Sequence, residues 1–122
     1  MIQQQLEIPL SPYAGLYDIV VPQDDIYRQL DRLVDFSFVY EEIGKNYSWK
    51  KGRFAEDPVR MFKYLLVKII DRLSDRRVVA NALVNLSLKR FLGLSPEETN
   101  IIDASTLSKF RKLRFENVDV LN

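Results

Sequence analysis

The chain contains neither cysteine nor histidine among its 122 residues. These absences exclude disulfides, thiolate and imidazole metal ligands, and every nucleophile that histidine would activate. Catalysis by the chain itself would therefore depend on carboxylates, lysine, tyrosine or a metal ion held by oxygen atoms. A protein without cysteine is also compatible with the reducing cytosol.

Glycine is scarce as well, with four residues in the whole chain, and neither GxGxxG nor GxxxxGK[ST] occurs. A nucleotide site is therefore not predicted. Adjacent carboxylates do occur, as in the pair Asp24 and Asp25, but neighbours in sequence point to different faces of a helix and do not converge on one ion. We expect no catalytic residue, no metal ligand and no cofactor in this chain.

Long apolar runs are absent too, since none approaches the roughly 18 residues that span a bilayer. The first residues, which read MIQQQ, lack a charged start followed by an apolar stretch. We therefore expect a protein that is neither exported nor membrane-bound, and a cytoplasmic location.

The formal charge of +1 hides a division between the two halves of the chain. Residues 1–57 hold 6 basic and 10 acidic side chains, whereas residues 58–122 hold 12 basic and 7 acidic ones. An anionic partner is accordingly expected to bind the second half.

The pattern of apolar residues predicts an all-α fold, a compact bundle of about five or six short helices over residues 23–116. Prolines at 9, 12 and 22 predict an extended arm over 1–22, and 117–122 form a tail. The strongest signal for the start of a helix is Asp57 followed by Pro58, a capping residue before a proline in the first turn. The last predicted helices resemble a helix-turn-helix. The predicted core consists of Phe62, Leu65, Leu66, Ile69, Ile70, Val79, Leu83, Phe91 and Phe110.

The last predicted helix, from about residue 104 to 115, is the best candidate for binding DNA. It contains no acidic residue between Ser105 and Phe115. Hydroxyls and amides at its start could bind phosphate oxygens, while its cations would release counterions from DNA. The candidate contacts are Ser105, Thr106, Ser108, Lys109, Arg111 and Lys112. The competing interpretation is an ordinary solvated helix.

A second candidate is the loop at 45–53, where basic and aromatic residues alternate. Lys50, Lys51 and Arg53 could contact phosphates or a narrow minor groove. The interpretation that we favour for this loop is that its aromatic residues anchor it to the core and its lysines are simply exposed.

Seven segments, in this order, resemble the opening region of insertion-sequence transposases of the IS1182 and IS5 type. They are 21–25 (VPQDD), 33–40 (LVDFSFVY), 52–59 (GRFAEDPV), 62–66 (FKYLL), 73–77 (LSDRR), 90–94 (RFLGL) and 103–112 (DASTLSKFRK). The resemblance covers residues 15–115 and is to the N-terminal domain called InsH-type or DUF772-like.

The resemblance implies a helical DNA-binding domain that, in the full family, precedes an RNase H-like domain with three carboxylates and two Mg²⁺ ions. That catalytic domain is expected to be missing here, so the chain should not be an enzyme although its parent is a transposase. The implied partner is double-stranded DNA at the element's ends, in the nucleoid of a bacterial cell, for DNA transposition and recombination.

An alternative function is a protein interaction module that dimerises or regulates the transposase without touching DNA. The acidic first half could supply the surface, with Phe36, Phe38 and Tyr40 near a predicted bend. This alternative predicts that the protein forms a homodimer. A self-contained enzyme is the least favoured hypothesis.

Overall fold

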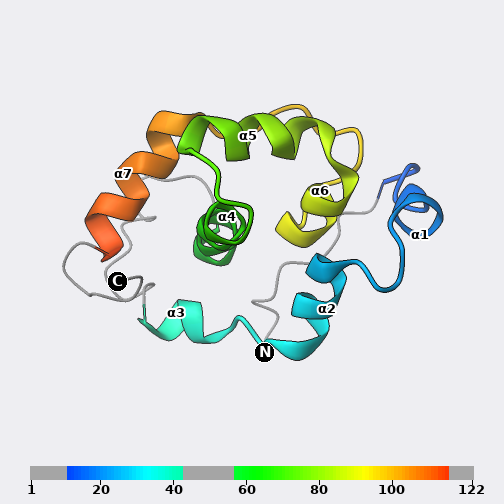
Figure 1. The fold of residues 1–122 in the computed structure, drawn as a ribbon, viewed down its shortest axis with the longest axis horizontal. Coiled ribbons are helices and arrows are strands. Elements are labelled where there is room, and N and C mark those ends of the chain that lie inside the picture. Colours follow the sequence, from blue (N-terminus) through cyan, green and yellow to red (C-terminus); the bar gives the residue numbers. More distant parts are fainter. Residues whose placement is uncertain (1–10, 43–56, 116–122) are drawn as a thin grey trace.

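The computed structural model describes residues 11–42 and 57–115, and every regular element within them is a helix. The helices are α1 (Leu16–Val20), α2 (Ile26–Leu33), α3 (Phe38–Glu42), α4 (Pro58–Ile70), α5 (Asp75–Val84), α6 (Leu86–Leu92) and α7 (Ala104–Phe115). Figure 1 shows α4 in the centre, viewed along its axis, with the other helices around it. The all-α prediction is confirmed, with seven helices in the described part of the chain.

Helix boundaries follow local capping rules. Asp57 caps α4 through its side chain, 2.7 Å from a first-turn amide, and Pro58 occupies the first turn, where its missing N–H is not needed. Ser74 caps α5 in the same way. Asn85 ends α5 and also caps α6, and Gly93 ends α6 with a left-handed φ of 80°. The start of α4 at Asp57 and Pro58 agrees with the prediction from the sequence.

The prediction of an extended arm over 1–22 is wrong for residues 16–20, which form α1, while residues 1–10 lie outside the described residues. Five residues do not form a stable helix alone, so contacts from elsewhere must hold it. The Tyr17 ring is buried, and its hydroxyl donates to the carbonyl of Leu94. The buried guanidinium of Arg28 donates to the Tyr17 carbonyl at 2.7 Å and to the Val21 carbonyl at 3.3 Å, which satisfies the end of the helix.

The core prediction was correct in part. Phe62, Leu65, Phe91 and Phe110 are buried, and Leu66 and Val79 pack against the core while partly exposed. Three predicted core residues are exposed instead, namely Ile69 (52%), Ile70 (38%) and Leu83 (41%). The prediction assumed one buried stripe along α4. The structure surrounds the first turns of α4 on all sides and leaves its last turn at the surface.

Lys63 is a buried cation in the middle of α4. Its ammonium lies 4.9 Å from the ring centre of Phe36 and 4.6 Å from that of Phe91. It donates to Asp31 and to the Phe91 carbonyl, both at 2.9 Å. Burial lowers the pKa of Lys63, and the neighbouring Asp31 opposes this effect. Lys63 therefore connects α2, α4 and α6 through one charge.

Three more cations of the second half bind backbone carbonyls or a carboxylate within the fold. Arg60 donates to the carbonyls of residues 92 and 93 at 2.8 and 3.1 Å, and Lys89 donates to those of residues 96 and 98 at 3.0 and 2.5 Å. Arg90 lies 3.3 Å from Asp31. Together with Lys63 these residues are called the internal cations, and they satisfy the end of α6 and the loop after it.

Candidate nucleic-acid interface

The helix α7 carries its polar and apolar residues on opposite sides. Leu107 and Phe110 are completely buried, and α7 packs against α4 and α5. Ser105, Lys109 and Lys112 are all exposed. Because 109 and 112 follow 105 by four and seven residues, the three side chains lie along one face. We call these three residues the α7 ridge.

The other predicted residues of α7 lie beside this ridge or turn away from it. Thr106 and Ser108 are half-buried. The guanidinium of Arg111 lies 2.8 Å from the carboxylate of Asp75, the first residue of α5, and Lys68 lies 3.8 Å from the same carboxylate. Arg111 therefore connects α7 to α5, a role that its neighbours in sequence did not indicate.

The second predicted cluster, Lys50, Lys51 and Arg53, lies outside the described residues, so its role stays a prediction.

Three exposed arginines were missed as candidates by the sequence analysis. Arg72 lies in the turn between α4 and α5, and Arg76 and Arg77 lie in the first turn of α5. Within residues 11–42 and 57–112 their side chains make no hydrogen bond or ion pair, which is also true of Lys109 and Lys112. The signal that could have found them is the segment LSDRR, because a serine cap at 74 places both following arginines in a first turn.

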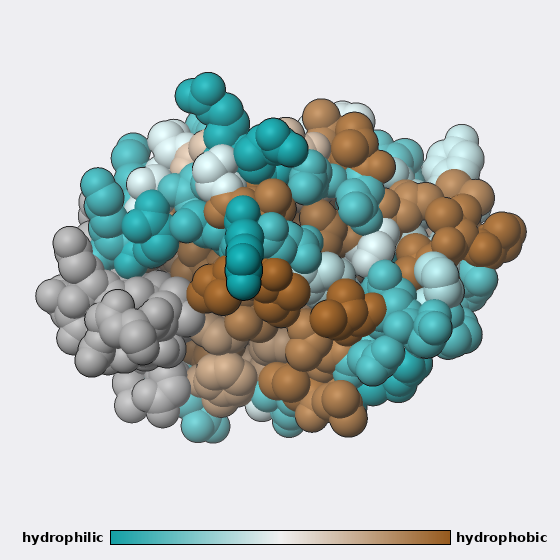
Figure 2. Space-filling model, viewed as in Figure 1, coloured by the Kyte–Doolittle hydropathy of each residue, from teal (hydrophilic) through white to brown (hydrophobic). Residues whose placement is uncertain are grey.

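These five residues are called the outer cations: Arg72, Arg76, Arg77, Lys109 and Lys112. Figure 1 shows the start of α5 beside α7, in agreement with the contact between Asp75 and Arg111. In the same view Figure 2 shows hydrophilic residues gathered over this corner, while hydrophobic residues gather around α1. The outer cations therefore lie on α5, on α7 and in the turn before α5, and the two helices pack together.

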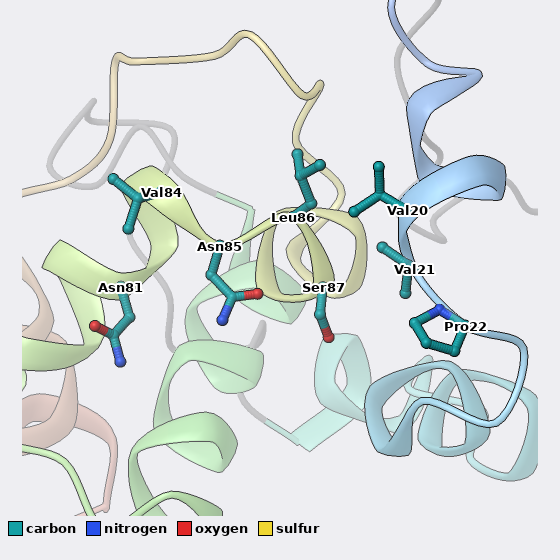
Figure 3. Close-up of a pocket in the computed structure, with 8 residues that line it drawn as sticks. All are labelled: Val20, Val21, Pro22, Asn81, Val84, Asn85, Leu86 and Ser87. Carbon is teal, nitrogen blue, oxygen red and sulfur yellow. The ribbon is translucent and has the colours of Figure 1, made fainter.

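A groove on another side of the molecule has a different character. Figure 3 shows it between the turn after α1 and the junction of α5 and α6, with a volume of about 480 Å³. It is lined by Val20, Val21, Pro22, Asn81, Val84, Asn85, Leu86 and Ser87. None of these side chains is a charged group, so the groove supplies no general acid or base.

No group of three acidic side chains in the described part of the chain could hold a metal ion. Among the same residues, no helix has the length and apolar character needed to cross a bilayer.

The three aromatic residues suggested for the alternative function are described by the structure, and they do not form one exposed surface. Phe36 is buried, and it contacts Phe38, Phe62 and Phe91. The Tyr40 hydroxyl donates to the Asp57 carboxylate at 2.6 Å. Of the three aromatic residues suggested for that surface, Phe38 alone is exposed.

Comparison with known proteins identifies the family. A family model described as "Transposase domain (DUF772)" matches residues 16–113, which is well over half of the chain and includes the seven described helices apart from the last two residues of α7. No curated protein and no solved structure matches the chain significantly. The family resemblance stated from the sequence is confirmed, while its IS1182 and IS5 subtype stays a prediction. The chain belongs to the DUF772 transposase domain family.

Proposed function

We propose that the domain binds double-stranded DNA at the ends of its element, with the α7 ridge against the phosphate backbone. Its family gives it a role related to transposition, a process that acts on DNA. The observation that carries the proposal is the pair Lys109 and Lys112, both exposed and without a partner among the described residues, on a helix anchored by two buried side chains.

The chemistry of this face suits phosphate. Each lysine that contacts a phosphate releases condensed counterions from the duplex, and an exposed hydroxyl such as Ser105 can donate to a phosphate oxygen. The half-buried Thr106 and Ser108 flank the ridge. The buried side chains of Leu107 and Phe110 hold the backbone of α7 in place, so DNA binding would cost little conformational entropy in this helix.

The distribution of charge also supports DNA over a general solvated surface. The internal cations are already bound to carbonyls and to Asp31, so their donor groups are not available to contact a ligand directly. The outer cations remain, and they lie on α5, α7 and the turn before α5. Exposed cations on neighbouring elements attract a polyanion such as DNA.

The test measures the affinity of the protein for a DNA duplex with the element's terminal sequence and for an unrelated duplex of equal length. Both affinities are measured at salt concentrations from about 50 to about 200 mM. Lys109→Gln and Lys112→Gln should each reduce the slope of log affinity against log salt by about 1. Arg32→Gln is the matched control, since it removes one exposed positive charge from α2, across the molecule in Figure 1.

Equal affinity and equal salt slope for the parent and the Lys109→Gln, Lys112→Gln double variant would rule out the α7 ridge as the DNA surface. A similar loss in Arg32→Gln would show that net charge, and not this face, controls binding.

Self-association is a second candidate function, favoured by apolar exposure near the groove of Figure 3. Ile19 is 80% exposed and Val84 is 79% exposed, in a fold that buries most of its other large apolar residues. Sedimentation equilibrium without DNA tests it. A dimer that Val84→Asp dissociates, combined with no DNA affinity in the parent, would favour this function over the first.

A further inference from the structure

The helix α4 ends with an arginine in a position that usually belongs to glycine. Arg72 has a φ of 56°, in the left-handed region. The amide of Leu73 donates to the carbonyl of Lys68 at 2.9 Å, and the amide of Arg72 donates to that of Ile69 at 3.3 Å. This pair of bonds is the Schellman motif, in which the left-handed residue is most often glycine.

The end of α6 shows the same motif with the usual residue. Gly93 has a φ of 80°, its amide donates to the carbonyl of Arg90 at 3.1 Å, and the amide of Leu94 donates to that of Lys89 at 2.9 Å. The two turns have equivalent backbones, so a side chain is not needed for this geometry. The left-handed conformation is unfavourable for a residue with a β-carbon, and Arg72 therefore destabilises its turn relative to glycine.

Arg76 and Arg77 also occupy unfavourable positions. They lie in the first turn of α5, where the positive end of the helix dipole favours acidic residues and disfavours cations. The acidic residue of that turn, Asp75, is directed to Arg111 and Lys68. Neither arginine gains an ion pair among the described residues in compensation.

Three exposed arginines within six residues thus stand where the local backbone favours other residue types. Folding stability does not account for them, whereas an anionic ligand does. Since Asp75 pairs with Arg111, the start of α5 packs against α7, the helix that carries the α7 ridge.

We propose that Arg72, Arg76 and Arg77 form a second phosphate-binding cluster, which contacts the same DNA duplex as the α7 ridge. This inference rests on the proposed function, because it assigns further contacts to the same ligand. Asp75 and Arg111 act as positioning residues, since their ion pair sets the start of α5 against α7 and so sets the spacing between the two basic groups. A planar guanidinium can donate two parallel hydrogen bonds to one phosphate, which suits arginine to this contact.

The experiment combines DNA binding with thermal unfolding of the full chain. Arg76→Gln and Arg77→Gln should each reduce the salt slope by about 1, as the lysines of α7 do. Arg72→Gly should weaken DNA binding and at the same time raise the melting temperature, because glycine relieves the left-handed turn. A structural role for Arg72 would instead lower the melting temperature. Arg32→Gln again serves as the control for loss of one exposed charge.

The possible outcomes separate this inference from the proposed function. If the lysine variants of α7 lose affinity while all three arginine variants bind as the parent does, the second cluster is wrong and the α7 ridge stands. If neither set of variants changes the affinity or its salt slope, both proposals are wrong. A loss in both sets, with Arg32→Gln unchanged, supports both.

Discussion

Lys63 on α4 and Lys109 on α7 both belong to the basic half of the chain, yet their ammonium groups lie in opposite surroundings. Lys63 is enclosed by two aromatic rings, a carboxylate and a carbonyl oxygen. Lys109 is exposed and has no partner in the described part of the chain. The difference shows that a count of basic residues does not locate a binding surface, because a cation bound inside the fold is not available to a ligand.

Asp75 contacts cations that are partly buried and is followed in sequence by cations that are exposed. Its carboxylate is 17% exposed and binds Arg111 and Lys68, and the same residue begins the helix that carries Arg76 and Arg77. One acidic residue therefore binds two nearby cations and leaves the others on that corner free. The contrast between internal and outer cations can be tested by removing one member of each group and measuring stability.

The largest effect is expected for Lys63→Ala. The substitution removes the 2.9 Å bond to Asp31, which keeps Arg90 as a partner, and opens a cavity between two rings, so it should reduce the free energy of unfolding by about 2–5 kcal/mol. Denaturant unfolding followed by circular dichroism measures the change. Lys63→Met is the matched control, since it keeps the apolar stem and should cost less. Parent-like unfolding of Lys63→Ala would contradict its assignment as an internal cation.

A smaller loss is expected for Asp75→Asn, which removes the negative charge shared by Arg111 and Lys68. Because a hydrogen bond to a charged group contributes about 1.5–3 kcal/mol, the free energy of unfolding should fall by that amount. The exchange of Asp75→Arg with Arg111→Asp should recover part of the loss. If the double exchange is less stable than the sum of its single variants, the pair does not couple α5 to α7 as described.

Titration of Lys63 is expected to make the stability of the fold depend on pH. Since burial lowers its pKa, the folded chain releases this proton at a lower pH than the unfolded chain, whose lysine pKa is about 10.4. The free energy of unfolding should therefore rise with pH within that window, by at most about 1.4 kcal/mol per unit, relative to Lys63→Met. Comparison with Lys63→Met removes the contribution of tyrosine titration. A constant difference between the two proteins across alkaline pH would contradict the prediction.

The smallest effect on stability is expected for Lys109→Met. An exposed side chain without a partner contributes little to folding, so the free energy of unfolding should stay within about 0.5 kcal/mol of the parent. The same variant should bind DNA less tightly. A loss of stability comparable to that of Lys63→Ala would move Lys109 into the internal group and weaken the proposed function.

Features that depend on neighbouring residues were predicted well. Asp57, Ser74 and Gly93 mark helix boundaries because a cap acts on amides or carbonyls within the adjacent turn. The α7 ridge was included in the prediction for the same reason, since side-chain spacing on one helix follows from the helical repeat.

Features that depend on distant residues were not predicted. Arg111 belongs to a basic run in the sequence, but its partner Asp75 lies 36 residues away. The helix α1 requires Tyr17 to bind the Leu94 carbonyl, 77 residues later, and the burial of Arg28. No local rule contains those contacts, because the energy of a short helix comes mainly from its packing.

The sequence by itself determined the helical class of this protein, the start of its central helix α4, its family and the helix with the α7 ridge. Each of these follows from residue types and spacing over a few turns. Only the tertiary structure decided which cations are exposed. That decision depends on where carbonyl ends, aromatic rings and carboxylates come together in three dimensions, since a charge stays inside a protein only where such partners replace its water.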